Sequence, residues 1–485
     1  MTGKQKQELH AALLAAFPDT LALAKMVAFR LDENLEAIAG GSTLDNAVFK
    51  LILWAEARGR VEELIEKACE EQPDNASLRA VARHLTPPSA VGEPLATRFH
   101  DFHLRAWQLD DGHAQVMVHS SLAGSLRKPL TVASDLSQRD ALCQLADKQW
   151  QGRRGTRRQI TEMGRLLAPR LFPPAVSSLF VRSLERLAPD EGLRLRLCLD
   201  EALVDLPWEF LYAPELTGKD GLDGFLVLDT RVSLVREAPV ACPKLPPLKQ
   251  KQRLVFAGAL KADGTDPWEV AAEYQSLEQA LAPLAEFLVL EYSAAAGDGI
   301  EQLLSRPAAI FHYSGHTESH NGRGYLVREV RHLVPPGLPH FHDVDPLFSD
   351  RLDDLLRRAG TRLAVFSACY SGRWAFVSPL LQAGLAAVVG IQGGISSKAA
   401  GLFSERLYSA LAVGLSLDEA TIWARQSILD TEVSPGQESC EWGALMVYMP
   451  AADAVLLPRP EELEEVHRQQ AAIRRERSRP GNSRR

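Results

Sequence analysis

The stretches LAVFSACYSG at residues 363–372 and AAIFHYSGH at residues 308–316 share one pattern. Each contains an unbroken apolar run, and apolar runs of about 4–8 residues are typical of strands buried on both faces of a sheet. Each also ends near a side chain that can carry chemistry, because Cys369 follows the first run and His316 follows the second. If the two strand ends lie side by side, these residues predict a cysteine peptidase; if they do not, both are ordinary strand-end residues.

Similar apolar runs recur on both sides of these two stretches. From residue 253 onward they alternate with amphipathic segments of helical periodicity, one beginning near Trp268 and another following Cys369. The apolar runs there are LVFAG, FLVLEY, AAIFHY, LAVFS, AAVVGI and ALMVYM. Earlier strand-like segments are HAQVMVHSS, LRLRLCL and FLVLDTRVSLV. This alternation predicts an α/β fold with a mainly parallel sheet flanked by helices.

The carboxyl ends of parallel strands meet at one edge of an open sheet, where catalytic groups gather. If the two strands are neighbours, His316 and Cys369 lie together at that edge. An imidazole so placed can take the thiol proton, and the thiolate can attack a carbonyl carbon. Backbone amides beside Cys369, where the chain turns into a helix, can hold the developing oxyanion. The pair therefore predicts nucleophilic catalysis by a cysteine.

A simpler interpretation is that Cys369 is a buried core thiol and His316 an ordinary turn residue. The Ser-Gly pairs at 314–315 and 371–372 favour the catalytic interpretation, because small residues leave the strand ends open to a substrate chain. His312 lies inside its strand, and we expect it to be packed in the core.

The bulk composition argues against several classes of protein. The formal net charge of −8 argues against a general nucleic-acid binder. No apolar stretch reaches the ~18 residues of a membrane helix. The six cysteines are scattered without a CxxC pair, so we expect neither a zinc site nor a disulfide framework, and no cofactor. The N-terminal residues lack an uninterrupted apolar signal core, which predicts a cytoplasmic location.

The chain is too long for one compact core, and its pattern divides it into five segments. Residues 1–86 have helical periodicity and few strand signals, which predicts a small all-α bundle. Residues 87–99 include most of the stretch TPPSAVGEP and are expected to form a linker. The α/β pattern covers residues 100–245 and 246–455, and residues 456–485 are a charged tail.

The motif HYSGH, followed about 50 residues later by FSACYSG, resembles the CHAT peptidases of bacteria, caspase-like enzymes in the clan of caspases and separase. Other stretches similar to the CHAT pattern are LRLRLCLDEALVDLPWEFLY, WEVAAEYQSLEQAL, and SLDEATIWAR followed by EWGALMVYMP. The likeness covers roughly residues 100–455. It implies a caspase-like fold in which a pseudo-catalytic half, residues 100–245, braces the catalytic half, residues 246–455.

The same resemblance implies roles for residues at the two strand ends. His316 would be the general base and Cys369 the nucleophile, and the amides of Cys369 and Thr317 would form the oxyanion hole. The family usually has glycine at the position of Thr317. A side chain there restricts the backbone, so this departure bears directly on the oxyanion role of the Thr317 amide.

Substrate-binding residues are implied by comparison with caspases. Caspases have glutamine two residues before the cysteine, which helps to read an acidic side chain, and this chain has Ser367 there. Asp263 and Asp266 lie where caspases carry a basic residue, so an acidic pocket would favour Arg or Lys in the substrate. The alternative is that both aspartates cap the helix that follows them.

Residues 1–86 resemble the effector-associated domains of the first type, small helical adaptors in bacterial conflict systems. The matching stretches are LHAALLAAFPD, VFKLILWAEARGRVEELI and EQPDNASLR. The resemblance implies a death-fold-like bundle that pairs with a matching helical domain on a partner protein. Trp54 is expected to serve either that contact or the core of the bundle.

Together these features predict a bacterial cysteine endopeptidase that cleaves a protein substrate in antiviral defence or programmed cell death. Its N-terminal domain would recruit or regulate it, and oligomerisation is left open. Two alternatives are a catalytically inactive CHAT scaffold that joins partner proteins, and a hydrolase of small molecules that uses the same pair.

Overall fold

The computed structural model describes residues 3–72, 75, 77, 78, 81, 98–109, 112–133, 157–219, 221–238, 240, 251–259, 267–295, 298–328, 345–432, 440–450 and 457. The chain divides into two compact units, Met1–Leu95 and Ala96–Arg485. Each unit has its own hydrophobic core.

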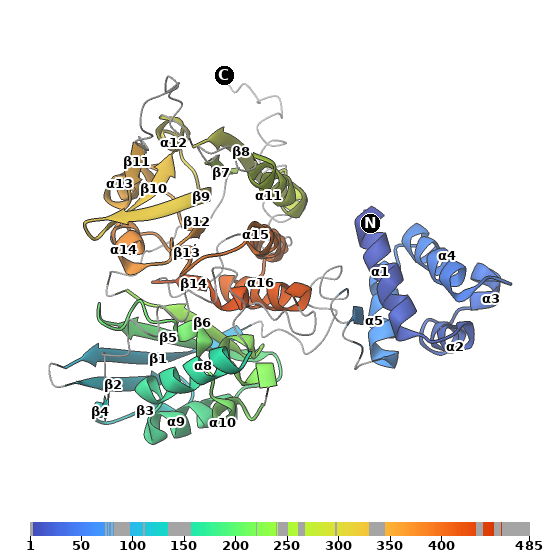
Figure 1. The fold of residues 1–485 in the computed structure, drawn as a ribbon, viewed down its shortest axis with the longest axis horizontal. Coiled ribbons are helices and arrows are strands. Elements are labelled where there is room, and N and C mark those ends of the chain that lie inside the picture. Colours follow the sequence, from blue (N-terminus) through green and yellow to red (C-terminus); the bar gives the residue numbers. More distant parts are fainter. Residues whose placement is uncertain are drawn as a thin grey trace, which may run out of the picture. The chain divides into compact units, whose positions relative to one another are not determined.

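The described part of the first unit is all-helical (Figure 1). Its helices are α1 (Gly3–Ala16), α2 (Thr20–Arg30), α3 (Leu35–Ala39), α4 (Leu44–Ala57) and α5 (Val61–Glu71). Side-chain oxygens of Asp19, Asn34 and Thr43 accept hydrogen bonds from the first turns of α2, α3 and α4, which explains where these helices begin. The predicted all-α organisation of this unit is confirmed for its described residues.

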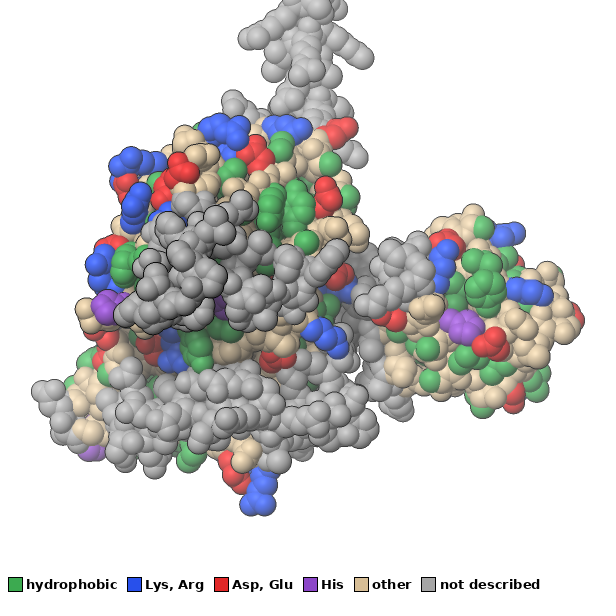
Figure 2. Space-filling model, turned by 45° about the horizontal axis from the view of Figure 1, so that its top comes forward, with side chains coloured by type: hydrophobic (Ala, Val, Ile, Leu, Met, Phe, Trp, Pro, Cys, Tyr) green, Lys and Arg blue, Asp and Glu red, His purple; other side chains and the backbone are tan. Residues whose placement is uncertain are grey.

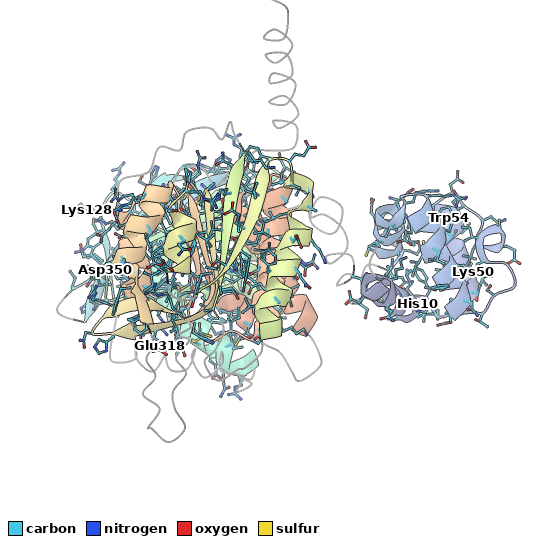
Figure 3. The ribbon with its side chains drawn as sticks, turned by 90° about the horizontal axis from the view of Figure 1, so that it is seen from above. His10, Lys50, Trp54, Lys128, Glu318 and Asp350 are labelled. Atoms are coloured by element: carbon cyan, nitrogen blue, oxygen red, sulfur yellow. The ribbon has the colours of Figure 1, made fainter. Side chains whose placement is uncertain are left out.

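The helices of the first unit bury one apolar face each and leave other apolar side chains outside. Trp54 packs against the core, and the guanidinium carbons of Arg58 and Arg60 lie 5.0 and 5.1 Å from its ring centre (Figure 3). Leu21 and Phe29 on α2 are 65% and 80% exposed. Figure 2 shows such hydrophobic side chains lying among charged ones on one face of this unit.

Within the described residues, no single helix combines the length and the apolar character needed to cross a membrane. The helix pair Lys6–Ala16 and Thr20–Arg30, bent by 105°, meets those criteria only when its two members are taken together.

The second unit is built on one mixed, mostly parallel sheet (Figure 1). Its main order is β11-β10-β9-β12-β13-β14-β6-β5-β1-β2-β3, while β4 pairs with β2, and β7 pairs with both β8 and β9. The strands are β1 (Arg98–Gln108), β2 (His113–Ser120), β3 (Gly124–Ser125), β4 (Leu130–Ala133), β5 (Glu191–Leu199), β6 (Val232–Arg236), β7 (Gln252–Gly258), β8 (Leu288–Ala294), β9 (Ile310–His320), β10 (Arg323–Arg328), β11 (Asp345–Phe348), β12 (Leu363–Cys369), β13 (Ala387–Ile391) and β14 (Leu445–Tyr448).

Helices cover both faces of the part of the sheet that contains β9 and β12. Helices α11, α15 and α16 pack together on one face, and α12, α13 and α14 lie on the other (Figure 1). The helices of the unit are α8 (Arg157–Leu171), α9 (Pro174–Leu184), α10 (Pro214–Thr217), α11 (Pro267–Ala280), α12 (Gly299–Leu304), α13 (Ser349–Ala359), α14 (Trp374–Gln382), α15 (Ser397–Ala412) and α16 (Leu417–Glu432). Short 3-10 turns are η2 (Trp208–Phe210), η3 (Gly221–Gly224), η4 (Leu226–Leu228), η5 (Ala282–Leu284) and η6 (Glu441–Gly443). The predicted sheet flanked by helices is confirmed.

The sheet continues across the division expected near residue 245. Strand β14 pairs in parallel with β6 through Tyr448 and Arg236, so the last described strand of the chain joins the earlier strands to the later ones. Strand β13 runs antiparallel to β14, with Val389 opposite Val447. Residues 100–245 and 246–455 therefore share one sheet.

A buried ion pair supports the strand at this junction. Arg236 donates to Glu209 from Nε (3.1 Å) and Nη2 (2.5 Å), and Nη2 also donates to the Leu206 carbonyl at 3.0 Å. The two charged side chains are 1% and 0% exposed. Two charges this deeply buried are tolerated because each neutralises the other and their polar atoms are hydrogen-bonded.

Replacing Glu209 with Ala should lower the free energy of unfolding of the second unit by about 3–5 kcal/mol, because it leaves Arg236 charged and buried without its partner. Urea denaturation followed by the fluorescence of buried Trp208 measures the change. The control is Glu162→Ala, which removes an exposed pair with Arg158 on α8 and should cost less than ~0.5 kcal/mol. Equal losses in the two variants would contradict this account.

Candidate active site

Strands β9 and β12 lie side by side and run in parallel, so their carboxyl ends meet at one edge of the sheet (Figure 1). The register begins with Leu363 opposite Ile310 and ends with Cys369 opposite His316. Both end residues are partly exposed. The structure thus brings together the two residues proposed as nucleophile and base, whose catalytic roles remain a prediction.

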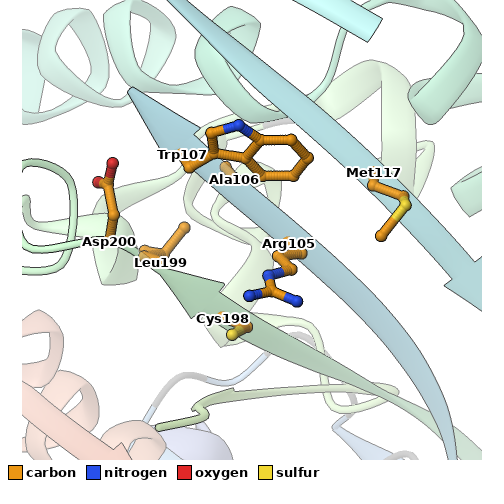
Figure 4. Close-up of a pocket in the computed structure, with 7 residues that line it drawn as sticks. All are labelled: Arg105, Ala106, Trp107, Met117, Cys198, Leu199 and Asp200. Atoms are coloured by element: carbon orange, nitrogen blue, oxygen red, sulfur yellow. The ribbon is translucent and has the colours of Figure 1, made fainter. Parts of the chain in front are cut away.

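Another partly exposed free cysteine, Cys198, lies elsewhere in the sheet. It lines a shallow, largely apolar pocket of about 490 Å³ with Trp107 and Met117, near the carboxyl ends of β1 and β5 (Figure 4). Burial raises the pKa of the Cys198 thiol, which keeps it protonated near neutral pH. Strands β13, β14 and β6 separate β5 from β12, so this pocket is not part of the strand end that holds Cys369.

The chain turns sharply directly after Cys369. Tyr370 has a φ of 63°, in the left-handed region that a non-glycine residue occupies at a cost of ~1–3 kcal/mol. Tyr370 N donates to the Gly393 carbonyl at 3.0 Å and so ties the turn to the chain that follows β13. The Cys369 Sγ lies 3.9 Å from the carbonyl oxygen of Ile395. The candidate nucleophile therefore stands at the start of a fixed turn between β12 and α14.

A residue from the first part of the unit caps α14, the helix that follows this turn. Asp205 Oδ1 accepts a hydrogen bond from Trp374 N at 2.9 Å, and the Asp205 carbonyl accepts one from Gln392 Nε2 at 2.8 Å. A carboxylate at a helix N-terminus satisfies an amide and interacts favourably with the helix dipole. Asp205 is not among the residues predicted from the sequence, and its position just before LPWEFLY is the one signal for it there.

Below the strand end, a buried carboxylate gathers polar side chains from β9 and α15. Glu273 Oε1 lies 3.1 Å from His312 Nε2 and accepts from Ser404 Oγ at 2.5 Å, while Oε2 accepts from Ser314 Oγ at 2.6 Å. His312 Nδ1 lies 3.1 Å from the hydroxyl of Tyr408. All five side chains are buried. The prediction that His312 is a packed core histidine is confirmed.

The Glu273 carboxylate is ionised in this environment. Burial alone would raise its pKa, but the hydrogen bond and charge of His312 and the hydroxyls of Ser314 and Ser404 more than offset that effect and hold the pKa below its ordinary value. His312 and Ser314 alternate with His316 along β9 and so share its face of the sheet. Glu273 therefore anchors the strand that carries the candidate base.

The sequence indicates a buried position for Glu273, although no role was predicted for this residue. Glu273 lies in α11, within the stretch WEVAAEYQSLEQAL. Val270 and Leu277 lie three residues before and four residues after Glu273, so all three fall on one helical face, and all three are buried. A charged residue on such an apolar face indicates a buried polar partner.

Of the three residues proposed to bind substrate, the structure describes Ser367 alone. Ser367 lies opposite Ser314 in the register and two residues before Cys369, on the same face of the sheet. It is 6% exposed, and its hydroxyl has no hydrogen-bond partner in the described part of the chain. Asp263 and Asp266 lie outside the described residues.

Two side chains on the opposite face hold the backbone at the strand ends. Thr317 Oγ1 donates to the carbonyl of Cys369. The Tyr313 hydroxyl accepts from His316 N at 3.2 Å and lies 2.8 Å from the Val327 carbonyl oxygen. Burial raises the pKa of Tyr313, so the hydroxyl keeps its proton and can donate. The oxyanion role proposed for the Thr317 amide remains a prediction.

The described site offers a thiol, an imidazole and backbone amides for chemistry. Within the described ranges, no group of three or more His, Cys, Asp or Glu side chains is arranged to hold a metal ion.

Two family models match the chain. A model described as Effector-associated domain 1 matches residues 1–86, and a model described as CHAT domain matches residues 161–451. The second match covers more than half of the chain. Among curated proteins, no sequence matches.

Solved structures similar to the chain have low sequence identity to it. One Saccharomyces cerevisiae separase–securin complex has a chain that is 10% identical, with 88% of this chain and 35% of that chain covered and a TM-score of 0.40. A chain of a second such complex is 10% identical, with 92% of this chain and 36% of that chain covered and a TM-score of 0.41. A chain in the complex of Porphyromonas gingivalis RgpB pro- and mature domains is 13% identical, with 67% of this chain and 78% of that chain covered and a TM-score of 0.38. The chain thus spans 35–36% of the separase chains that it matches.

Replacing Glu273 with Gln should lower the free energy of unfolding by about 1–3 kcal/mol at pH 7.5, because an amide group replaces one acceptor oxygen among groups that donate to it. The folded carboxylate has a depressed pKa, so its stabilisation is present above the ordinary value of 4.5 and is lost as the pH falls through the lower folded value. The difference in free energy of unfolding between wild type and Glu273→Gln should therefore become smaller below pH 4.5. Urea denaturation at a series of pH values from 7.5 downward measures this difference.

The control for this measurement is Glu278→Gln on the same helix. Glu278 is exposed, and its replacement should change stability by less than ~0.5 kcal/mol at every pH. The loss of stability in Glu273→Gln could instead stay constant from pH 7.5 down to the acid range. That result would show that the ionised carboxylate does not hold β9 in place.

Proposed function

The chain belongs to the CHAT family, and we propose that it is a cysteine endopeptidase with His316 as general base and Cys369 as nucleophile. The observation that carries this proposal is the in-register pairing of β9 and β12, which puts Cys369 opposite His316 at the carboxyl edge of the sheet. The family match supports a caspase-like cysteine protease fold. The resemblances inferred from the residue motifs are confirmed by the two family models.

The proposed reaction has two steps. In the first, a ring nitrogen of His316 takes the thiol proton of Cys369, and the thiolate forms a bond to the carbonyl carbon of the scissile peptide. The amides of Cys369 and Thr317 hold the resulting oxyanion. The imidazolium then gives its proton to the leaving amine as the carbon–nitrogen bond breaks. In the second step, water attacks the thioester with His316 again as base and releases the acid.

The environments of the two histidines on β9 support the choice of base. His316 is partly exposed at the strand end, where a substrate can reach it. His312 is 0% exposed and both of its ring nitrogens face partners, Glu273 and Tyr408. A base must accept and release a proton at the substrate, so His316 fits the role and His312 fits a structural one.

The proposed substrate is a protein cut after Arg or Lys. This proposal rests on the negative charges that Asp263 and Asp266 place in the sequence before α11, and on Ser367 where caspases have glutamine. Ser367 supports it as a small residue two positions before Cys369 whose hydroxyl has no partner among the described residues. A basic side chain would pair with the aspartates by charge.

The N-terminal unit is proposed to bring the peptidase to a partner that carries a matching helical domain. Its match to the Effector-associated domain 1 model supports the domain assignment. The adaptor role in a bacterial defence or cell-death system in the cytoplasm is part of the proposal. Exposed Phe29 and Leu21 on α2 offer an apolar surface for that contact, while Trp54 is covered by Arg58 and Arg60. Large exposed apolar side chains are candidates for such contacts.

Cys369→Ala should reduce cleavage of a mixed peptide library by about 10³-fold or more, because no acyl-enzyme can form. His316→Ala should be nearly as damaging, since no base is then placed to take the thiol proton. Mass spectrometry of the library measures both the loss and the side chain preferred at the cleaved position. Cys198→Ala is the matched control and should cleave normally. Undiminished cleavage by Cys369→Ala would end the peptidase assignment at this site, whereas no cleavage by the wild-type protein would favour the inactive scaffold.

A chain that starts at Pro94 should cleave a short peptide within a few fold of wild type, because the first unit has its own core and contributes no catalytic residue. It should lose binding to purified first-type effector-associated domains, a panel that includes residues 1–86 of this chain. Within the full chain, Phe29→Ser should weaken that binding, while Glu36→Gln, exposed on α3, should not. Surface plasmon resonance measures binding. Normal binding by the shortened chain would refute the adaptor role.

A further inference from the structure

The residue after the candidate base makes a side-chain contact with the backbone of the candidate nucleophile. Thr317 is 7% exposed and its Oγ1 donates to the carbonyl oxygen of Cys369. Its backbone is ordinary strand, paired with Leu326 of β10, and Thr317 is not among the described non-glycine residues with positive φ. No backbone constraint therefore calls for glycine here, and a β-branched residue suits the strand.

The peptide group between Cys369 and Tyr370 is hydrogen-bonded at both its carbonyl oxygen and its N–H. The carbonyl of the Cys369–Tyr370 peptide accepts from Thr317, and its N–H donates to the Gly393 carbonyl at 3.0 Å. A peptide group is planar, so hydrogen bonds at both ends fix its orientation. That orientation sets the backbone torsions on either side, including the φ of 63° at Tyr370.

The orientation of this peptide group matters because it adjoins the candidate nucleophile. It fixes the backbone of Cys369 from which Sγ projects, and it directs the Tyr370 amide into the Gly393 carbonyl. A Cys369 carbonyl that lacks the Thr317 hydroxyl as a donor is held less firmly, so the strained turn at Tyr370 can relax. Small displacements of a nucleophile have large effects on rate.

We propose that Thr317 is a positioning residue for the nucleophile, acting through its hydroxyl on the Cys369 carbonyl. This inference rests on the proposed cysteine peptidase function. It is separate from the oxyanion role of the Thr317 amide, because every residue at this position except proline keeps the amide, while only a hydroxyl side chain makes the contact.

The test compares Thr317→Val with Thr317→Ser, and Thr317→Ala with Thr317→Ser. Val has the shape of Thr without the donor, and Ser keeps the donor without the methyl group. The Val and Ala variants should lose about tenfold in kcat with KM changed less than about twofold. The Ser variant should remain within about twofold of wild type in both constants. Single-turnover cleavage of a peptide from the library supplies the rate of acylation.

The same strand pair offers a matched control at its other end. Thr361 is 6% exposed and its Oγ1 donates to the Ala308 carbonyl at 2.9 Å, just before β12 and β9 begin. Thr361→Val removes a comparable buried hydrogen bond far along the strands from Cys369. It should lower stability about as much as Thr317→Val does, with kcat unchanged.

Four outcomes decide between the alternatives. Positioning by the hydroxyl is supported if kcat falls in Thr317→Val and Thr317→Ala but not in Thr317→Ser. Equal kcat values for Thr317→Ala and Thr317→Ser overturn it, and this pair remains informative if the Val variant does not fold. Equal losses in kcat for Thr317→Val and Thr361→Val overturn it as well, because they indicate a general loss of stability. Full activity of Cys369→Ala refutes the proposed function itself, and with it this inference.

Discussion

The parallel pairing of β9 with β12 is the constraint on which the rest of the second unit depends. Seven consecutive pairs, from Leu363 opposite Ile310 to Cys369 opposite His316, fix both the neighbours and the faces of these strands. Because side chains alternate along a strand, a slip of one residue would place Gly315 or Thr317 opposite Cys369 and turn the site residues to the other face. The geometry of the site therefore depends on contacts that keep β9 and β12 in this register.

Two hydrogen bonds join the chains of β9 and β12 at their two ends, and a third contact holds β9 in place between them. Thr361 binds the Ala308 carbonyl where the strands begin, the Glu273 carboxylate binds His312 and Ser314 in the middle, and Thr317 binds the Cys369 carbonyl at the end. A buried carboxylate is costly unless several donors satisfy it, so it accepts few alternative arrangements of its neighbours. Polar contacts of this kind select one register, where apolar packing alone would accept more than one.

The nucleophile turn depends on parts of the chain that are distant in sequence. Tyr370 reaches the chain after β13, and Asp205 from the first part of the unit caps α14. The Glu209–Arg236 pair holds the strand that joins β14, so a contact far from the site supports the same sheet. The strained φ of Tyr370 is maintained because these contacts together outweigh its local cost.

Apolar periodicity and turn residues act locally along the chain, so they were sufficient to predict the class of fold, the helical nature of the first unit and the two strand-end residues. Family motifs in the residues added the CHAT and effector-associated assignments. Three contacts became known only from the folded chain: Glu273 lies beneath β9, Asp205 caps α14 and Thr317 binds the Cys369 carbonyl. Each of these contacts joins residues from different elements, and sequence separation carries no information about which polar groups meet until the strands are ordered and paired.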